Sequence, residues 1–492
     1  MIESTLPIGV PLLLLGGAIV TVGAGLVRRS AAWPITLVVL VLSALVSVRQ
    51  LLVVLAEGPL THRLGGWPPP IGIEFAVDGL SAFVTSVVVV IALLVLLYAR
   101  DAVRRETPEE EVPFFALLQV LLLGLTGMVL TGDLFNLYVF FEISSLAGYA
   151  LVGLGSREAP VSAFRYLLLG SLGASFYLMG VGYLYVLTGS LNMADVASIL
   201  PGLIGNPTLT IAMTMMVAGL SLKMALFPLH GWLPDAYTYA SSTATAVIAP
   251  IMTKVSAYVL IRVLFFVCDP ALRATIPVGS TVAWLAATGI VVGSVMAIAQ
   301  SDVKRMLAYS SVAQVAYIGV GIGLGTPFAL IGATLHILSH ATMKSCLFLV
   351  TGSVQLQTGR RSLHSYEGLG RVMPWTFAGF TLAALAMIGI PPTAGFFSKW
   401  YLVLGGINAG EWPIVLIVVA SSLLTAGYFF RLMEKIYANP SPSLKANDPG
   451  MLARISIMAL GAGVLVLGVA NFWFVGEVLQ PALPATLRLT GM

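Results

Sequence analysis

The chain has 492 residues, of which 58% are hydrophobic and only 9% are charged, and its mean hydropathy is +0.97. This composition excludes a soluble globular protein and indicates a protein that crosses a lipid bilayer many times. The formal net charge of +4 is small and dispersed, so nucleic acid is excluded as a partner.

The two cysteines, Cys268 and Cys346, lie far apart, each in an apolar run. Their placement excludes a disulfide framework, a CxxC pair and a haem-attachment motif. We therefore expect no redox centre and no cofactor in this chain.

Apolar runs of about twenty residues follow one another along the chain, as in membrane-spanning helices and unlike the alternating strands of a β-barrel. They predict an all-α polytopic membrane protein with about fourteen transmembrane helices. Basic residues gather in alternate connections, so the positive-inside rule places both termini on the non-cytoplasmic side. The predicted spans are centred near Leu15, Leu42, Val89, Leu122, Leu146, Tyr177, Met216, Ser256, Val291, Tyr317, Ile337, Leu385, Val419 and Leu465.

The span NLYVFFEISSLAGYALVGLG carries Glu142 well inside it, with Asp133 at its start. One interpretation is a static buried ion pair with Lys223, but desolvation of both charges would offset most of its stabilisation. The interpretation that we favour is a proton site. Burial favours a neutral lysine and a nearby carboxylate favours a charged one, so movement of either group would switch the lysine between the two forms.

Residues 219–237, GLSLKMALFPLHGWLPDAY, place Lys223 one turn before Pro228. Proline removes a backbone donor and frees a carbonyl, which predicts a break in this span. Freed carbonyls are tolerated at membrane depth where they line protein or water. A simple kink is the alternative.

Three further lysines lie within predicted spans or at their edges. Lys254 is deep, so a snorkelling side chain is disfavoured there. Lys344 and Lys399 lie nearer predicted span ends, where snorkelling and a buried functional site remain equal alternatives.

The stretch HILSHATMKSCLF spaces His336, His340 and Lys344 four residues apart, so the three side chains share one helix face. A zinc site would need a third protein ligand, and no acidic residue neighbours this face, so we predict no metal. Histidine titrates near neutral pH and can pass a proton between its ring nitrogens. The pattern therefore favours a proton relay.

The stretch MIGIPPTAGFFSKW predicts a second break, at Pro391 and Pro392, a few residues before Lys399. One broken helix with a lysine in each half of the chain is typical of paired structural repeats around an ion path.

The chain resembles a known family over most of its length, namely the antiporter-like subunits of Mrp-type cation/proton antiporters, respiratory complex I and membrane-bound hydrogenases. It looks most like the D-type subunits of the Mrp antiporters. The resembling stretches are TGDLFNLYVFFEISSLAGYALVG, LKMALFPLHGWLPDAY, TKVSAYVLIRV, AIAQSDVKRMLAYSSVAQVAYIGVG and GIPPTAGFFSKW.

The resemblance implies two inverted five-helix repeats, each with a broken helix, within about fourteen helices. We expect N-terminal helices in residues 1–112, repeats in 113–270 and 271–440, and a C-terminal helix in 441–492. The family's proton-path residues correspond to Glu142, Lys223, Lys254 and Lys399, and its polar helix, less closely, to His336, His340 and Lys344.

The function implied is that of a proton-translocating, non-enzymatic subunit of a multisubunit Na⁺/proton antiporter in a bacterial or archaeal cell membrane. The alternative is a pumping subunit of a redox complex, either complex I or a membrane-bound hydrogenase. Other membrane subunits, protons and Na⁺ are the expected partners. Protons would enter near His230 and Asp235, pass Lys223, Lys254, His340 and Lys344, and leave by Lys399.

Overall fold

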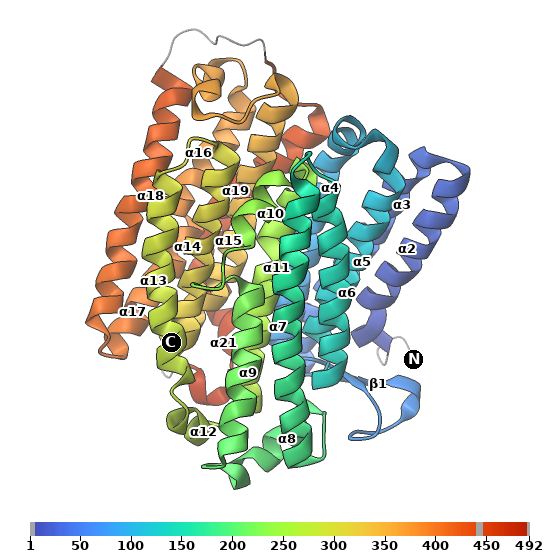
Figure 1. Cartoon of the computed structure of the whole chain (residues 1–492), viewed down its shortest axis with the longest axis vertical. Helices are drawn as coiled ribbons and strands as arrows, with labels where there is room; N and C mark the ends of the chain where they lie inside the picture. Colours follow the sequence, from blue (N-terminus) through green and yellow to red (C-terminus); the bar gives the residue numbers. More distant parts are fainter. Residues whose placement is uncertain (1–4, 439–445, 490–492) are drawn as a thin grey trace.

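The computed structural model describes residues 5–438 and 446–489, and nearly all of them are helical (Figure 1). Within these ranges thirteen helices are long and apolar enough to cross a membrane, and fourteen if one bent segment is counted as a span. The predicted all-α polytopic architecture is confirmed.

Three long helices and a small antiparallel strand pair precede the first repeat. The carboxylate of Asp78 accepts from the Ser81 amide and the Ser81 hydroxyl accepts from the Asp78 amide, a capping box that begins the third helix. The elements are α2 (Gly9–Val27), α3 (Ala32–Glu57), β1 (Leu60–Arg63), β2 (Glu74–Val77) and α4 (Gly79–Glu106).

The two repeats have the same order of long helices, and in each the fourth span is broken. The first contains α5 (Glu111–Leu130), α6 (Leu134–Gly153), α7 (Ala159–Thr188), α8 (Met193–Ile199), α9 (Pro207–Met224), α10 (Leu233–Tyr239) and α11 (Ser242–Arg262). The second contains α13 (Val278–Ile298), α14 (Val303–Leu324), α15 (Pro327–Thr358), α16 (Pro374–Ile388), α17 (Ala394–Asn408) and α18 (Trp412–Ala438). The short α12 (Pro270–Thr275) connects them, and α19 (Met451–Val469), α20 (Asn471–Phe474) and α21 (Gln480–Ala482) follow.

Matching backbone contacts relate the repeats. Asp133 caps α6 and Asp302 caps α14, each the second helix of its repeat. The amide after Asp133 donates to the Leu191 carbonyl at 2.8 Å, and the amide after Asp302 donates to the Arg361 carbonyl at 3.0 Å. Both acceptors lie just beyond the third helix of the repeat, so equivalent turns close equivalent helices.

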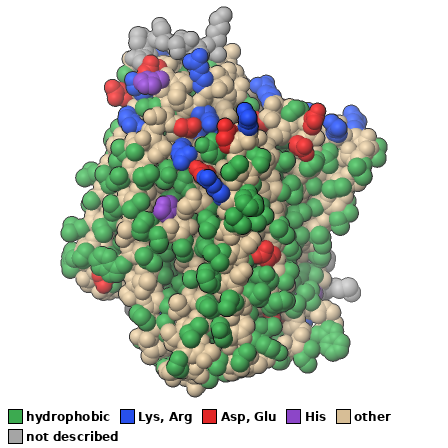
Figure 2. Space-filling model, viewed as in Figure 1, with side chains coloured by type: hydrophobic (Ala, Val, Ile, Leu, Met, Phe, Trp, Pro, Cys, Tyr) green, Lys and Arg blue, Asp and Glu red, His purple; other side chains and the backbone are tan. Residues whose placement is uncertain are grey.

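The repeats run in opposite directions. The turn after α5 bonds to β2 through the Gly132 amide and the Glu74 carbonyl, at the lower end of Figure 1. The first helix of the second repeat, α13, instead begins at that end, directly after α12 (Figure 1). On the face shown in Figure 2, lysine and arginine gather near the opposite, upper end.

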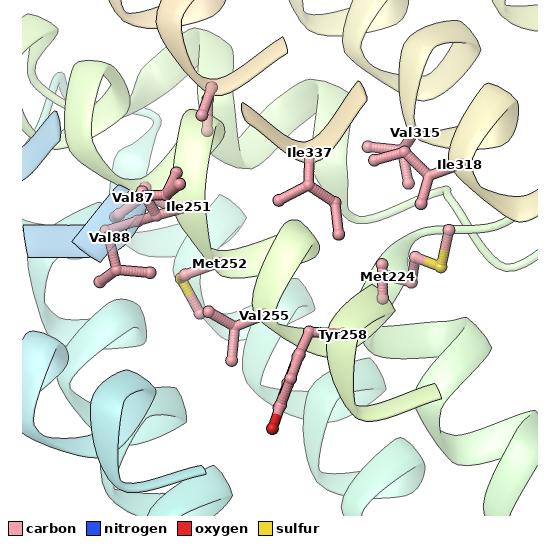
Figure 3. Packing of buried hydrophobic residues seen from close by; sticks show 14 of the residues in the cluster. Val87, Val88, Met224, Ile251, Met252, Val255, Tyr258, Val315, Ile318 and Ile337 are labelled. Carbon is pink, nitrogen blue, oxygen red and sulfur yellow. The ribbon is translucent and has the colours of Figure 1, made fainter. Parts of the chain in front are cut away.

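The central helices α11 and α15 are buried along nearly their whole length. Val255 of α11 belongs to one buried cluster with Val88 of α4, Ile318 of α14 and Ile337 of α15 (Figure 3). The polar residues on these two helices are therefore surrounded by protein rather than by lipid.

Candidate functional site

The first predicted break is present. Helix α9 ends at Met224, and Ala225 takes a left-handed conformation with φ 59° that turns the chain away from the helix axis. Pro228 lies within the break, as predicted. The Trp232 indole Nε1–H donates to the Leu222 carbonyl at 3.0 Å, beside the Ala225 amide, which donates to the same carbonyl at the end of the helix.

The second break explains why a lysine accompanies the prolines. Helix α16 ends at Ile388, and Pro391 and Pro392 lie between it and α17. The Lys399 Nζ donates to the Met387 carbonyl at 3.0 Å and to the Ile388 carbonyl at 3.1 Å. Carbonyls at a helix C-terminus carry partial negative charge and favour a cation, so the break creates the ammonium site.

Lys223 lies in a cage of aromatic rings. Its Nζ lies 5.1, 5.0 and 4.9 Å from the ring centroids of Phe141, Tyr149 and Tyr166. It donates to the Ser145 hydroxyl at 2.5 Å. Ring faces attract a desolvated ammonium, so the cage favours the charged form of the lysine.

Glu142 does not form the direct ion pair that the static interpretation required. Among the described residues no carboxylate oxygen lies within 4.0 Å of Lys223 Nζ, although the two groups are close enough to interact electrostatically. The expectation of a fully buried carboxylate is also wrong, because Glu142 is partly exposed midway along α6. The helix turns this side chain toward the outer surface of the bundle.

Lys254 is buried on α11, where its Nζ donates to the Ala249 carbonyl at 2.6 Å and to the Thr253 hydroxyl at 3.2 Å. The same helix contains Pro250, which cannot donate to the Ala246 carbonyl one turn earlier. Ser345 of α15 approaches that carbonyl at 3.5 Å. Sequence reasoning missed this proline, although its position four residues before Lys254 is visible.

The polar face of α15 is present as predicted. The rings of His336 and His340 stack with centroids 5.6 Å apart, and His336 Nδ1 lies 2.8 Å from the Ser398 hydroxyl. Lys344 donates to the Leu307 carbonyl at 2.7 Å and to the Ser310 hydroxyl. On this face three ring nitrogens have no partner among the described residues, namely His336 Nε2 and both nitrogens of His340.

The snorkelling alternative is excluded for Lys344 and Lys399, which are 0% and 6% exposed. These two lysines, Lys254 and the two histidines form one electrostatically connected group. Lys399 belongs to this group through His336. It interacts electrostatically with that histidine and follows Ser398, whose hydroxyl contacts His336. Lys223 lies outside this group and interacts electrostatically with Glu142.

His230 and Asp235, which we expect where protons enter, lie in different surroundings. Asp235 forms ion pairs with Arg165 at 3.0 Å and Arg305 at 3.2 Å, so it joins the two repeats. His230 lies inside the first break, with its ring 5.5 Å from that of Phe227, and its Nδ1 has no partner.

Two further basic residues lie away from solvent, Lys304 buried and Arg262 partly buried. Lys304 is 2% exposed and donates to the Ala240 carbonyl at 2.5 Å. Arg262 binds Asp78 through both terminal nitrogens, at 2.5 and 2.8 Å. In the sequence, Lys304 resembles a loop residue because Arg305 follows it. Arg262 instead lies in an apolar run, which indicates burial.

The family model described as NADH:quinone oxidoreductase/Mrp antiporter, TM, matches residues 131–425. The chain belongs to this family. It is 50% identical to the N-type subunit of the NADH-quinone oxidoreductase of Desulforudis audaxviator over 442 residues, 87% of this chain and 88% of that protein. It is 31% identical to the D-type subunit of the Na⁺/H⁺ antiporter of Bacillus subtilis over 437 residues, 87% of each.

Among solved structures, the chain is similar to one in the membrane-bound sulfane sulfur reductase, an archaeal respiratory membrane complex. The TM-score is 0.90 at 30% identity, with 97% of this chain and 96% of that chain covered. The protein is thus an antiporter-like, multi-pass membrane subunit.

Proposed function

We propose that this chain is the proton-translocating subunit of a multisubunit membrane complex. The observation that carries the proposal is that four lysines away from the helix starts, at most 6% exposed, have no acidic partner within ion-pair distance in residues 5–438 and 446–489. They are Lys223, Lys254, Lys344 and Lys399. A fifth lysine of this kind within these ranges, Lys304, lies in the first turn of α14 and is not part of the path. A structural buried ammonium is normally paired with a carboxylate, whereas an unpaired one readily loses its proton.

In the proposed path a proton reaches Lys223 from the cytoplasmic side, past His230 and Asp235, while Glu142 stabilises the charged lysine. It then passes Lys254, His340 and Lys344 and leaves through Lys399. His336 connects Lys344 with Lys399, because its ring contacts the hydroxyl of Ser398, the residue before Lys399. Moving one charge through 100 mV requires about 2.3 kcal/mol, which a change of between one and two pKa units in a lysine supplies. Both termini lie on the non-cytoplasmic side in this arrangement.

Glu142 supports the assignment of membrane partners. A carboxylate facing lipid is costly, yet exposed apolar side chains, among them Val139 and Leu146, flank it on α6. A neighbouring subunit that covers this face would shield the carboxylate from lipid.

The reaction that drives the protons has two candidates. The first is exchange with a monovalent cation, Na⁺, as the name of the Bacillus subtilis relative indicates. The second is electron transfer in a redox complex, which the 50% identity to a NADH-quinone oxidoreductase subunit favours. Flavin and iron-sulfur spectra of the purified native complex would indicate the second, and Na⁺-dependent pH gradients without an electron donor the first.

The test of proton translocation uses the complete complex in proteoliposomes with a pH-sensitive dye. Glu142→Gln and Lys223→Ala should leave assembly intact and lower proton flux by about tenfold or more, the scale of a lost acid-base group. Lys435→Ala, which removes a surface ion pair with Glu367, is the matched control and should leave flux unchanged. Full flux in both variants would refute the relay.

A further inference from the structure

The proposed path has a gap between its two groups of ionisable residues. Lys223 interacts electrostatically with Glu142, whereas Lys254 interacts with the α15 histidines and Lys344. A proton that reaches Lys223 must still cross to Lys254. The structure places aromatic rings in the space between these two groups.

Four rings form a continuous row, which we call the aromatic row: Tyr166, Trp232, Tyr237 and Phe348. The first two are stacked with centroids 4.1 Å apart and planes 7° apart. Edge contacts follow, at 6.2 Å between Trp232 and Tyr237 and at 6.3 Å between Tyr237 and Phe348.

A lysine lies at each end of this row. Lys223 Nζ is 4.9 Å from the Tyr166 ring, and Lys344 Nζ is 5.7 Å from the Phe348 ring. The row therefore fills the path between the two groups with apolar surface. A continuous file of water cannot pass through packed rings, so a proton needs a polar atom within the row.

The aromatic row contains two hydroxyl groups, and they differ in their surroundings. The Tyr166 hydroxyl lies 3.6 Å from the Met252 sulfur. The Tyr237 hydroxyl is fully buried and makes no hydrogen bond of standard geometry within the described residues, but it lies close enough to the Thr253 side chain to interact with it. Thr253 in turn accepts from Lys254 Nζ at 3.2 Å. Of the two, only the Tyr237 hydroxyl leads to Lys254.

We propose that the Tyr237 hydroxyl carries protons across the aromatic row between Lys223 and Lys254. Charged Lys223 gives a proton to a water molecule, which passes one on to the Tyr237 oxygen, while the proton of that hydroxyl passes to the Thr253 hydroxyl and Thr253 releases one to neutral Lys254. Lys223 is left neutral and Lys254 charged. Each hydroxyl gains one proton and loses one, so neither keeps a charge. This inference rests on the proposed function of the chain.

The break between α9 and α10 determines the position of Tyr237. Tyr237 belongs to α10, the short helix after the break, and Trp232 fixes the start of that segment through the Leu222 carbonyl. A continuous α9 would carry the chain away from α11 and Thr253. The break thus places both a ring and a hydroxyl between the two groups.

The test is Tyr237→Phe in the complete complex, assayed for proton flux in proteoliposomes. The change removes one oxygen atom that makes no hydrogen bond of standard geometry within the described residues, so assembly should be retained while flux falls by about tenfold or more. Tyr366→Phe is the matched control, because it also removes a fully buried hydroxyl without a hydrogen-bond partner among the described residues, outside the aromatic row, and its flux should stay within about twofold of wild type. Flux in Tyr237→Phe equal to that in Tyr366→Phe would overturn the proposal.

A second measurement covers the case in which Tyr237→Phe does not assemble. Site-specific 3-fluorotyrosine at position 237 keeps the ring and the hydroxyl but makes the hydroxyl more acidic, so the pH profile of flux should shift. An unchanged profile would overturn the proposal. Lys223→Ala, assayed in parallel, separates the two hypotheses: low flux there with full flux in Tyr237→Phe would reject this inference alone.

Discussion

At the scale of single residues, the buried lysines show that rings, hydroxyls and carbonyls can surround an ammonium group in several ways without a carboxylate in direct contact. Lys223 is held by rings and a hydroxyl, Lys254 by a carbonyl beside a proline, and Lys399 by the end of a broken helix. Carbonyl and hydroxyl oxygens bind an ammonium and also leave it free to become neutral, because no buried anion loses its partner. Each site is suited to gaining and losing a proton.

Lys399→Met should therefore weaken the second repeat as well as stop flux. The change leaves the Met387 and Ile388 carbonyls without the donor that satisfies them. Loss of such partners costs about 1–3 kcal/mol for each buried group, so the unfolding temperature in detergent should fall measurably. Lys399→Arg keeps a cation and should retain more stability than Lys399→Met, and equal stability would contradict the assignment.

Asp78 supplies a prediction on pH. Burial alone would raise the pKa of this carboxyl, but the Arg262 guanidinium and the Ser81 hydrogen bonds outweigh it and hold the pKa below its usual value. A depressed pKa means that the stabilisation is present above the unfolded pKa of about 3.9 and is lost as pH falls through the folded pKa. Acid unfolding of the wild type should show this loss below about pH 4, and Asp78→Asn should lack that component.

At the scale of elements, the two broken helices depend on close backbone approach. A Cβ added at Gly395 of α17 would lie 1.9 Å from the Ala386 carbonyl of α16. The halves of the second broken span therefore touch through a glycine, which fixes the angle between them and holds Lys399 near the end of α16.

Gly395→Ala should push these halves apart, lower the unfolding temperature and reduce proton flux, because overpacking typically costs about 1–3 kcal/mol. Gly427→Ala on α18 is the matched control, since nothing lies within 4 Å of a Cβ added there. Gly427→Ala should leave both quantities near wild type. Equal effects of the two changes would show that contact across the break is unimportant.

The sequence predicted the breaks well but not the packing around them. Pro228, Pro391 and Pro392 report directly on the local backbone, so both breaks follow from sequence. The aromatic cage of Lys223 depends on which helices meet, and spacing within one helix does not contain that information. The exposure of Glu142 was missed because lipid and protein interior are equally apolar, so a lipid-facing run reads like a buried one.

At the scale of the whole molecule, the inverted repeats place both breaks around the central helices α11 and α15. Helices α6 and α7 lie nearer the periphery, and α6 carries the partly exposed Glu142 and the exposed Leu146. The proposed relay therefore has its first carboxylate at a surface of this subunit and its remaining members in the middle. The chain alone leaves that surface open to lipid.

A photo-reactive residue at position 146 tests whether a subunit covers this face. We expect cross-linking of Leu146, which is 59% exposed, to another membrane subunit in the native complex. The same probe at Val186, also exposed but near the end of α7, reports on how far the contact extends. Cross-linking only to lipid from position 146 would contradict a covering partner.

The central claim is that protons move through the buried group on α11 and α15 along a hydrated line. The most direct measurement is a structure of the complete complex by electron cryo-microscopy, at a resolution that shows ordered water. The account predicts water molecules bound to the two unpaired ring nitrogens of His340 and leading toward Lys254 and Lys344. Dry, close-packed apolar side chains around His340, with no room for water, would contradict it.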